Sequence, residues 1–240
     1  MPRVSRSRET FLVSSRRHIS YEDHMQSPRT EPVSAFSRID LLLTIASVLL
    51  VLLVFLPAFA VTRFRSSRLG CTNNLKEIGV AFRTFAIDNE DLFPMHVSAT
   101  NDGSLELVAS GRVFPHFLVM SNELSYPMKL VCPWDNTRTR ATSFARGLAD
   151  TNLSYFINVD ALETDGTSLL CGDRNLITKA SPGSRFVCLS STSVIGWTRE
   201  LHRKRGNLCF ADGSVQGYLN GAVGLAVQIP AGVTNRLAVP

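Results

Sequence analysis

The sequence lacks the motifs by which many hydrolases and metal-binding domains are recognised. It contains no H-E-x-x-H, no G-x-S-x-G and no glycine-rich phosphate loop. No two of its cysteines form C-x-x-C, and none is paired with a histidine at zinc-finger spacing. These absences argue against a structural zinc finger, and the sequence does not predict an enzyme.

Concentrated positive charge is also scarce, although the formal net charge is +5. Six arginines belong to a polar, serine-rich leader that we expect to be disordered. A second basic group follows the long apolar run described next and suits a helix end at a membrane interface. Nucleic-acid binding is therefore not expected. The two groups are Arg3, Arg6, Arg8, Arg16, Arg17 and Arg29, and Arg63, Arg65 and Arg68.

One apolar run dominates the N-terminal quarter of the chain. From Leu41 to Val61 no residue is charged, and about 20 residues suffice to cross the roughly 30 Å of hydrocarbon in a bilayer. We therefore expect a membrane-spanning helix, with the longer and more basic leader in the cytoplasm. The residues Ala58-Phe59-Ala60 also fit a small-x-small cleavage site, so release of a secreted domain after Ala60 stays open.

All cysteines follow this apolar run, on the side where disulfides persist if the leader is cytoplasmic. Their odd number leaves at least one without a partner in its own chain. The sequence does not predict which of them pair. They are Cys71, Cys132, Cys171, Cys188 and Cys209.

Helical periodicity continues beyond the apolar run. Leu75, Ile78, Phe82 and Phe85 recur at steps of three and four residues, with polar residues between them. We expect an amphipathic helix that ends near Asn89, loosened or bent at proline and glycine positions before it. Those positions are Pro57 and Gly70.

Beyond Pro94 short apolar runs alternate with turn residues, which is typical of strands. The last two runs flank "ADGS", and Asp-Gly between apolar residues is a strong hairpin signal. We expect an α+β fold in which a long helix packs on a small antiparallel sheet. A surface loop is expected over 133–150, and the tail 221–240 is either a last strand or an assembly surface. The expected strands are 128–132, 153–159, 168–172, 206–210 and 214–219.

The stretch "AFSRID", followed by the apolar run, resembles the prepilin N-terminal segment of type IV pilins and type II secretion pseudopilins. The resemblance implies cleavage between Ala35 and Phe36, with methylation of the new N-terminal Phe36. Asp40 then takes the fifth mature position, where the family carries an acid. The implied parts are a leader (1–35), a membrane helix (36–61), its amphipathic continuation (62–93) and a pilin-like head (94–240).

Asp40 is the candidate assembly residue. The resemblance implies that its carboxylate meets the N-terminal amine of a neighbouring subunit, since a carboxylate in a membrane is costly without a partner. A simpler role also stays open, because an acid in the first helical turn is stabilised by the dipole of its own helix.

A second resemblance lies near the C-terminus, in "LHRKRGNLCFADGSVQGY". His202, nine further residues and Asp212-Gly213 resemble the H-X9-DG segment of prepilin-like proteins of planctomycete and verrucomicrobial type. Four other pieces are similar to such proteins: "CTNNLKEIGVAFRTFAIDNEDLFP", "LVCPWD", "LSYFIN" and "GDRN".

We expect structural roles for this motif: Asp212 bonds to the turn, Gly213 supplies a positive φ and His202 fixes the entry of the strand. A calcium site with oxygen ligands from Asp173 and Asp212 is the alternative, and no other cofactor is expected. Structural roles are also expected for His96 and His116, and packing roles for Trp134 and Trp197.

The two resemblances together imply a structural subunit of a type II secretion or type IV pilus-like assembly. It would lie in a bacterial inner membrane, with the head in the periplasm. Its partners would be other pilin-like subunits, prepilin peptidase and the lipid bilayer. The alternative is a signal-anchored or secreted ectodomain with a binding or hydrolytic role, cleaved after Ala60.

Overall fold

The computed structural model describes residues 37–177, 185–222, 224 and 227–240, and within them all side chains except those of residues 57–68. The leader, Ala35 and Phe36 lie outside the described residues, and so do the side chains of Pro57, Arg63, Arg65 and Arg68. The chain divides into two compact units between Val51 and Leu52.

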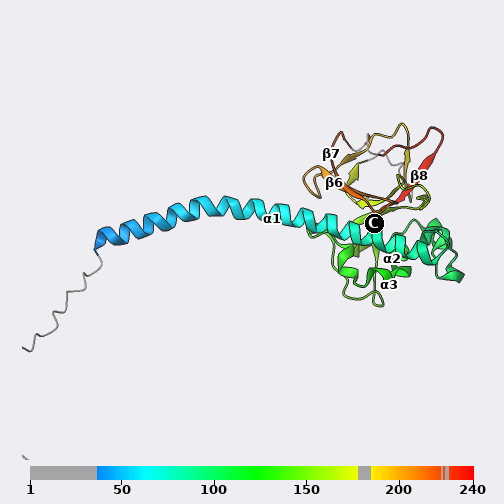
Figure 1. Cartoon of the computed structure of the whole chain (residues 1–240), viewed down its shortest axis with the longest axis horizontal. Coiled ribbons are helices and arrows are strands. Elements are labelled where there is room, and N and C mark those ends of the chain that lie inside the picture. Colours follow the sequence, from blue (N-terminus) through cyan, green and yellow to red (C-terminus); the bar gives the residue numbers. More distant parts are fainter. Residues whose placement is uncertain (1–36, 178–184, 223, 225–226) are drawn as a thin grey trace, which may run out of the picture. The chain divides into compact units, whose positions relative to one another are not determined.

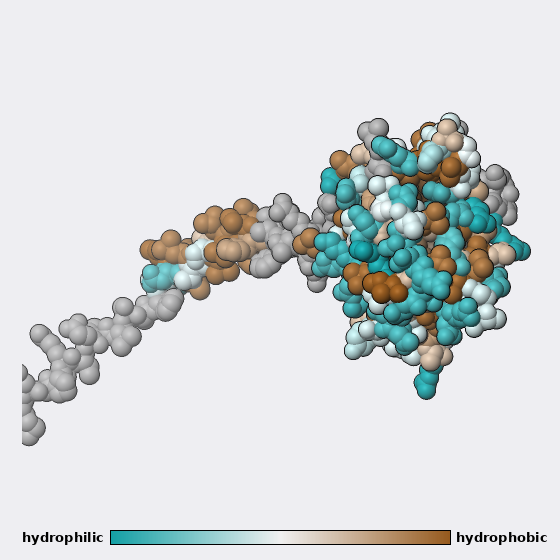
Figure 2. Space-filling view, turned by 45° about the vertical axis from the view of Figure 1, so that its right-hand side comes forward, coloured by the Kyte–Doolittle hydropathy of each residue, from teal (hydrophilic) through white to brown (hydrophobic). Residues whose placement is uncertain are grey.

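The first long element is helix α1 (Arg38–Asp88), which has 51 residues. Its segment Arg38–Leu56 has a mean hydropathy of 2.9, and none of its side chains is buried. Figure 2 shows these hydrophobic side chains uncovered. By length and composition this segment can cross a bilayer, and the assigned helix runs through positions 57 and 70 without interruption.

The second half of α1 is amphipathic, as the sequence predicts. Leu75, Ile78 and Phe82 are fully buried, and Phe85 is nearly so. The helix ends one residue before Asn89, whose side-chain amide donates to the carbonyl of Phe85 (2.8 Å). Positive φ values in the next two residues then turn the chain away.

Short helices, rather than strands, occupy the chain up to residue 152. The strand expected at 128–132 is wrong: its first residues form a 3-10 helix, which Pro127 begins with its fixed φ. The loop expected at 133–150 is confirmed up to the last residue, where a 3-10 helix begins. The elements are η1 (Pro94–His96), η2 (Ala99–Asn101), η3 (Leu105–Ser110), α2 (Phe114–Val119), α3 (Ser121–Leu124), η4 (Pro127–Leu130) and η5 (Asp150–Asn152).

The remaining chain forms an antiparallel sheet in the order β4-β8-β1-β2-β6-β7, and a two-stranded sheet of β3 and β5. Four of the five expected strands are confirmed as β1, β2, β6 and β7, and the tail supplies β8. The α+β class is therefore confirmed. The strands are β1 (Tyr155–Asn158), β2 (Leu169–Asp173), β3 (Leu176–Ile177), β4 (Val187–Ser190), β5 (Gly196–Trp197), β6 (Arg205–Phe210), β7 (Val215–Leu219) and β8 (Thr234–Ala238).

Strands β6 and β7 form the hairpin that the sequence predicts, with Leu208 opposite Gln216. Gly213 has a φ of +82°, which glycine adopts at little cost. Asp212 accepts a hydrogen bond at Oδ1 from the backbone N–H of Ser214 (2.8 Å). Both expectations for this turn are confirmed.

The main core lies where α1 meets the sheet on one side and the short helices on the other (Figure 1). Phe82 packs edge-on against Phe93 and Phe117, with ring centroids 5.7 and 6.1 Å apart. The helix approaches the sheet closely at Gly79, where an added Cβ would lie 2.8 Å from the Sγ atom of Cys209. The opposite face of the sheet is also buried, around Trp197.

Replacing Phe82 by alanine should destabilise the head by about 3–5 kcal/mol, because the ring fills the junction of three elements. The measurement is the free energy of unfolding by urea of the full chain in detergent. Val80→Ala is the matched control, since Val80 lies on the same turns of α1 and is exposed. Equal losses in the two variants would contradict the packing described here.

Candidate functional site

His202 is buried in a loop that precedes β6, with 1% of its surface exposed. It opens a run of three residues in the left-handed region, with φ values of 51° for His202, 53° for Arg203 and 66° for Lys204. Residues other than glycine adopt this conformation at a cost of about 1–2 kcal/mol each. The fold therefore holds His202 in place against a local preference of the backbone, which is a feature of many functional sites.

Asn175 holds this loop. It is buried, and its side-chain nitrogen lies within hydrogen-bond distance of the carbonyl oxygens of Thr198 (3.2 Å), Leu201 (3.1 Å) and Arg205 (3.2 Å). These carbonyls lie before and after His202, so one amide fixes both ends of the strained segment. The expected role of His202 at the strand entry is consistent with this arrangement.

The His202 ring meets a disulfide between Cys71 of α1 and Cys132 of the segment after η4. Its Nε2 atom lies 3.4 Å from the Sγ atom of Cys132 and 3.5 Å from the Oδ2 atom of Asp173. All four side chains are buried. We call this set, Cys71, Cys132, Asp173 and His202, the buried cluster.

Asp173 lies at the end of β2 and is fully buried. Its Oδ2 atom accepts hydrogen bonds from the backbone N–H of Asn207 (2.7 Å) and from the side-chain amide of Asn207 (2.8 Å). Among the described residues, its Oδ1 atom has no hydrogen-bond partner. Burial raises the pKa of Asp173 to about 7, and the bonds from Asn207 offset only part of that rise.

A second buried carboxylate, Asp135, lies in a different environment. It accepts hydrogen bonds from Arg174, Thr137 and Ser154. Burial alone would raise the pKa of Asp135, but these bonds and the charge of Arg174 outweigh it and lower the pKa to about 2. Arg174 extends the network to Glu200 at 3.0 Å. This network joins the loop after Cys132 to the strands beside it.

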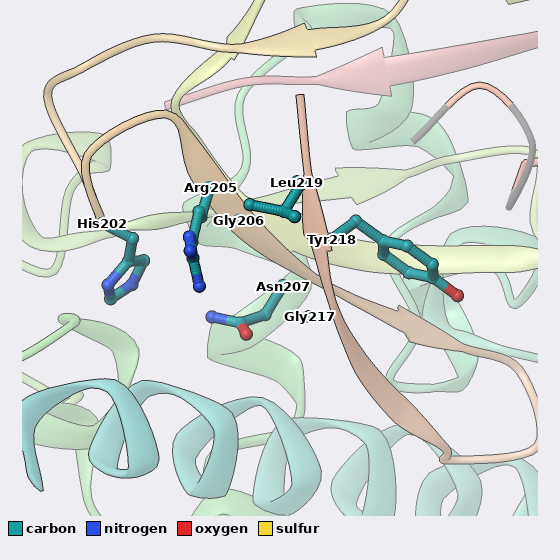
Figure 3. Close-up of a pocket in the computed structure, with 7 residues that line it drawn as sticks. All are labelled: His202, Arg205, Gly206, Asn207, Gly217, Tyr218 and Leu219. Atoms are coloured by element: carbon teal, nitrogen blue, oxygen red, sulfur yellow. The ribbon is translucent and has the colours of Figure 1, made fainter. Parts of the chain in front are cut away.

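A small pocket of about 30 Å³, enough for one water molecule, borders the buried cluster at His202. Figure 3 shows the side chains of His202, Arg205 and Asn207 grouped beside β6, whereas the ring of Tyr218 points away from them.

The structure does not bring Asp173 and Asp212 together. Asp173 bonds to Asn207 near the start of β6, whereas Asp212 follows the end of that strand. From Asn207 the strand runs three more residues to Phe210, which is about 10 Å, and Asp212 lies two residues further on in the turn. The two carboxylates cannot share a calcium ion, so that expectation is wrong.

His96 and His116 have structural partners, as expected. His96 Nε2 lies 2.9 Å from the carbonyl oxygen of Ala161, and the Nδ1 atom of buried His116 lies 2.7 Å from the Ser104 hydroxyl. Burial lowers the pKa of His116 to about 4, so its ring is neutral near pH 7. Trp197 is a core residue, and Trp134 packs partly buried against the main core.

Three cysteines are free: Cys171 and Cys209 are buried, and Cys188 is exposed. Cys171 and Cys209 face each other across β2 and β6. The pKa of Cys171 is raised well above its usual value, first by burial and then by contact with Cys209. An unpaired cysteine follows from the odd count, as expected.

The buried cluster has no direct signal in the sequence, because its members come from distant segments. Cys71 and Cys132 are 61 residues apart, and short-range spacing rules do not cover such pairs. Each member nevertheless lies in one of the pieces that resemble prepilin-like proteins, "CTNN", "LVCPWD", "GDRN" and "LHRK".

Replacing Asp173 by asparagine should change how stability depends on pH. The pKa of Asp173 is about 7 when folded, against about 4 in an unfolded chain. Between these two pH values Asp173 is protonated in the folded chain and ionised in the unfolded chain. The contribution of this group to the stability of wild type therefore falls as pH rises from about 4 to 7, and it is constant above pH 7. The stability of Asp173→Asn relative to wild type should therefore rise by a few kcal/mol across the window.

The measurement is urea unfolding of both proteins in detergent at several pH values. The difference between them is the quantity to follow, since His116, with its lowered pKa, makes both more stable as pH rises through the same range. The opposite result is a variant whose stability relative to wild type falls as pH rises. It would show that Asp173 is ionised in the folded chain and held by His202.

Known proteins add nothing to this description of the site. The comparisons of this chain with protein-family models, with curated proteins and with solved structures give no match. The assignment of function therefore depends on the residues and contacts described above.

Proposed function

We propose that this protein is a pilin-like structural subunit, anchored in a membrane by the N-terminal half of α1. The observation that carries the proposal is a single helix with two different halves. Its segment Arg38–Leu56 is apolar with no side chain buried, and its later residues form the centre of the head's core. An uncovered apolar surface of this length needs lipid or other apolar helices around it.

The disulfide supports an export route for the head. Cys71–Cys132 is buried in the core, and such structural disulfides persist in oxidising compartments such as the bacterial periplasm. With the leader in the cytoplasm, the described head would lie on the periplasmic side of an inner membrane.

Asp40 supports assembly through the start of α1. Ser37 and Asp40 form a reciprocal cap: the N–H of Ile39 donates to the Ser37 hydroxyl (3.2 Å), and the N–H of Ser37 donates to Asp40 Oδ2 (3.1 Å). This cap is a local role for Asp40 at the start of its own helix. It also holds an exposed carboxylate at the first turn, with further capacity to accept hydrogen bonds. An N-terminal amine of another copy, produced by cleavage before Phe36, would be a suitable partner.

Replacing Asp40 by asparagine tests this contact, because asparagine can still cap the helix but has no charge. We expect dimers of the full chain in membranes to fall several-fold. The readout is oxidative cross-linking through Leu49→Cys, since Leu49 is exposed in the apolar segment, in a Cys188→Ser background that removes the exposed thiol.

Ser37→Ala is the matched control, because it removes the other half of the cap and leaves the charge. Its dimer yield should remain that of the parent. Equal dimer yields in Asp40→Asn and the parent would show that the charge of Asp40 has no role in assembly. Equal losses in Asp40→Asn and Ser37→Ala would assign the effect to helix capping.

The second candidate is a secreted ectodomain released by cleavage after Ala60. The specific observation in its favour is that, among the described side chains of α1, the first buried one is Cys71. A cut after Ala60 would therefore leave these core contacts in place. The rival function would be binding or hydrolysis by the released head.

N-terminal sequencing of the mature protein should distinguish these outcomes. We expect a start at Phe36, with a methylated amine, because Phe36 directly precedes the capped start of α1. A start at Val61 would indicate a secreted domain. An intact Met1 would indicate a plain single-pass anchor and would contradict processing as a prepilin.

A further inference from the structure

The buried cluster contains more chemistry than a structural disulfide needs. The Sγ atoms of Cys71 and Cys132 and the Nε2 atom of His202 all lie within 4.8 Å of one another. A disulfide surrounded by apolar side chains would need neither the imidazole nor the Asp173 carboxylate. Burying polar groups costs free energy unless they gain partners, so an imidazole placed between a disulfide sulfur and a buried carboxylate requires an explanation.

Two distances, both from His202 Nε2, match those between ligand atoms of a tetrahedral metal site. Ligand bonds of about 2.0–2.3 Å in tetrahedral geometry place neighbouring ligand atoms about 3.3–3.8 Å apart. His202 Nε2 lies 3.4 Å from Cys132 Sγ and 3.5 Å from Asp173 Oδ2. A tetrahedral site has six distances between pairs of ligand atoms. Two of these six already have the expected length in the disulfide-bonded state.

We propose that the buried cluster binds one zinc ion when the Cys71–Cys132 disulfide is reduced. The ligands are the two thiolates, Nε2 of His202 and the carboxylate of Asp173. Thiolate, imidazole and carboxylate together are a ligand set that Zn²⁺ prefers, and four protein ligands are typical of a structural rather than a catalytic zinc site. The same residues thus have two alternative states, a disulfide and a metal centre.

The change between the two states balances with a dithiol as reductant. The dithiol gives two electrons and two protons to the disulfide and becomes a disulfide itself, which leaves Cys71 and Cys132 as thiols. Zn²⁺ then displaces both thiol protons to solvent. With two thiolates, one carboxylate and a neutral imidazole, the occupied site has a net charge of −1.

Asp173 is the residue that most needs such a cation. Its side chain is fully buried, and among the described residues its Oδ1 atom has no hydrogen-bond partner. The two bonds from Asn207 to Oδ2 fix the orientation of the carboxylate, as outer-shell groups do around metal ligands. Asn207 in turn lies 3.4 Å from the Thr72 hydroxyl, next to Cys71 in α1.

A small pocket lies beside the cluster. It is lined by His202, Arg205 and Asn207, among others, and has room for about one water molecule (Figure 3).

The test loads the reduced full chain, in detergent and without oxygen, with Co²⁺ as a spectroscopic probe for zinc. We expect about one Co²⁺ per chain, with sulfur-to-cobalt charge-transfer bands and the strong visible bands of tetrahedral cobalt. Zn²⁺ should displace the cobalt and remove both sets of bands. The oxidised chain should give neither.

Two double variants make the test specific to this pair of cysteines. Cys71→Ser with Cys132→Ser should abolish the charge-transfer bands, whereas Cys171→Ala with Cys209→Ala should keep them. Under reducing conditions neither the first variant nor the wild type has the Cys71–Cys132 disulfide. The folding of the two proteins can therefore be compared directly. His202→Gln and Asp173→Asn should each weaken Co²⁺ binding at least tenfold, as changes at or next to metal ligands do.

Several results would overturn the proposal. One is a reduced wild-type chain that binds no stoichiometric Co²⁺. Another is charge-transfer bands that persist in Cys71→Ser with Cys132→Ser and vanish in Cys171→Ala with Cys209→Ala, which would place the metal on the cross-strand pair of thiols. All of these readouts are independent of whether the chain assembles into filaments.

Discussion

Burial of one face of α1 is the interaction on which the head depends. The main core joins the sheet to the short helices through side chains of α1, among them those of Leu75, Ile78 and Phe82. Polar contacts fix the register of this packing: the amide of Asn74 donates to the carbonyl of Val131 (3.2 Å) and contacts the hydroxyl of Tyr155 (3.3 Å). Without α1, the inner face of the sheet would lose its cover.

One helix therefore has two different parts. The segment Arg38–Leu56 is long and apolar enough to cross a membrane, and Cys71 is the first buried side chain among those described in α1. Cys71 is also the member of the buried cluster that α1 contributes. A covalent bond there fixes the start of the packed half of α1 to the head, and a metal ion with the same ligands would preserve that connection.

The elements that the sequence predicted correctly are those with strong local signals. The amphipathic face of α1 and the hairpin at Asp212-Gly213 follow from periodicity and turn chemistry, which act within a few residues. The segment 128–132 has the composition of a strand, but Pro127 begins a helical turn there and Cys132 is held by Cys71. The buried cluster depends on tertiary contacts between four segments, and no local rule contains that information. The calcium expectation failed for the same reason, since it assumed a proximity that the length of β6 rules out.

The two buried carboxylates of the head show why Asp173 is the more informative one. Asp135 has the guanidinium of Arg174 at 2.8 Å, and its pKa of about 2 means that it is ionised and satisfied. Among its described contacts Asp173 has no arginine or lysine, and burial raises its pKa to about 7. A buried carboxylate needs a proton, a protonated imidazole such as that of His202 at 3.5 Å, or a bound cation to balance it. The proposed zinc site uses the last of these, with the sulfur atoms and the imidazole as further ligands.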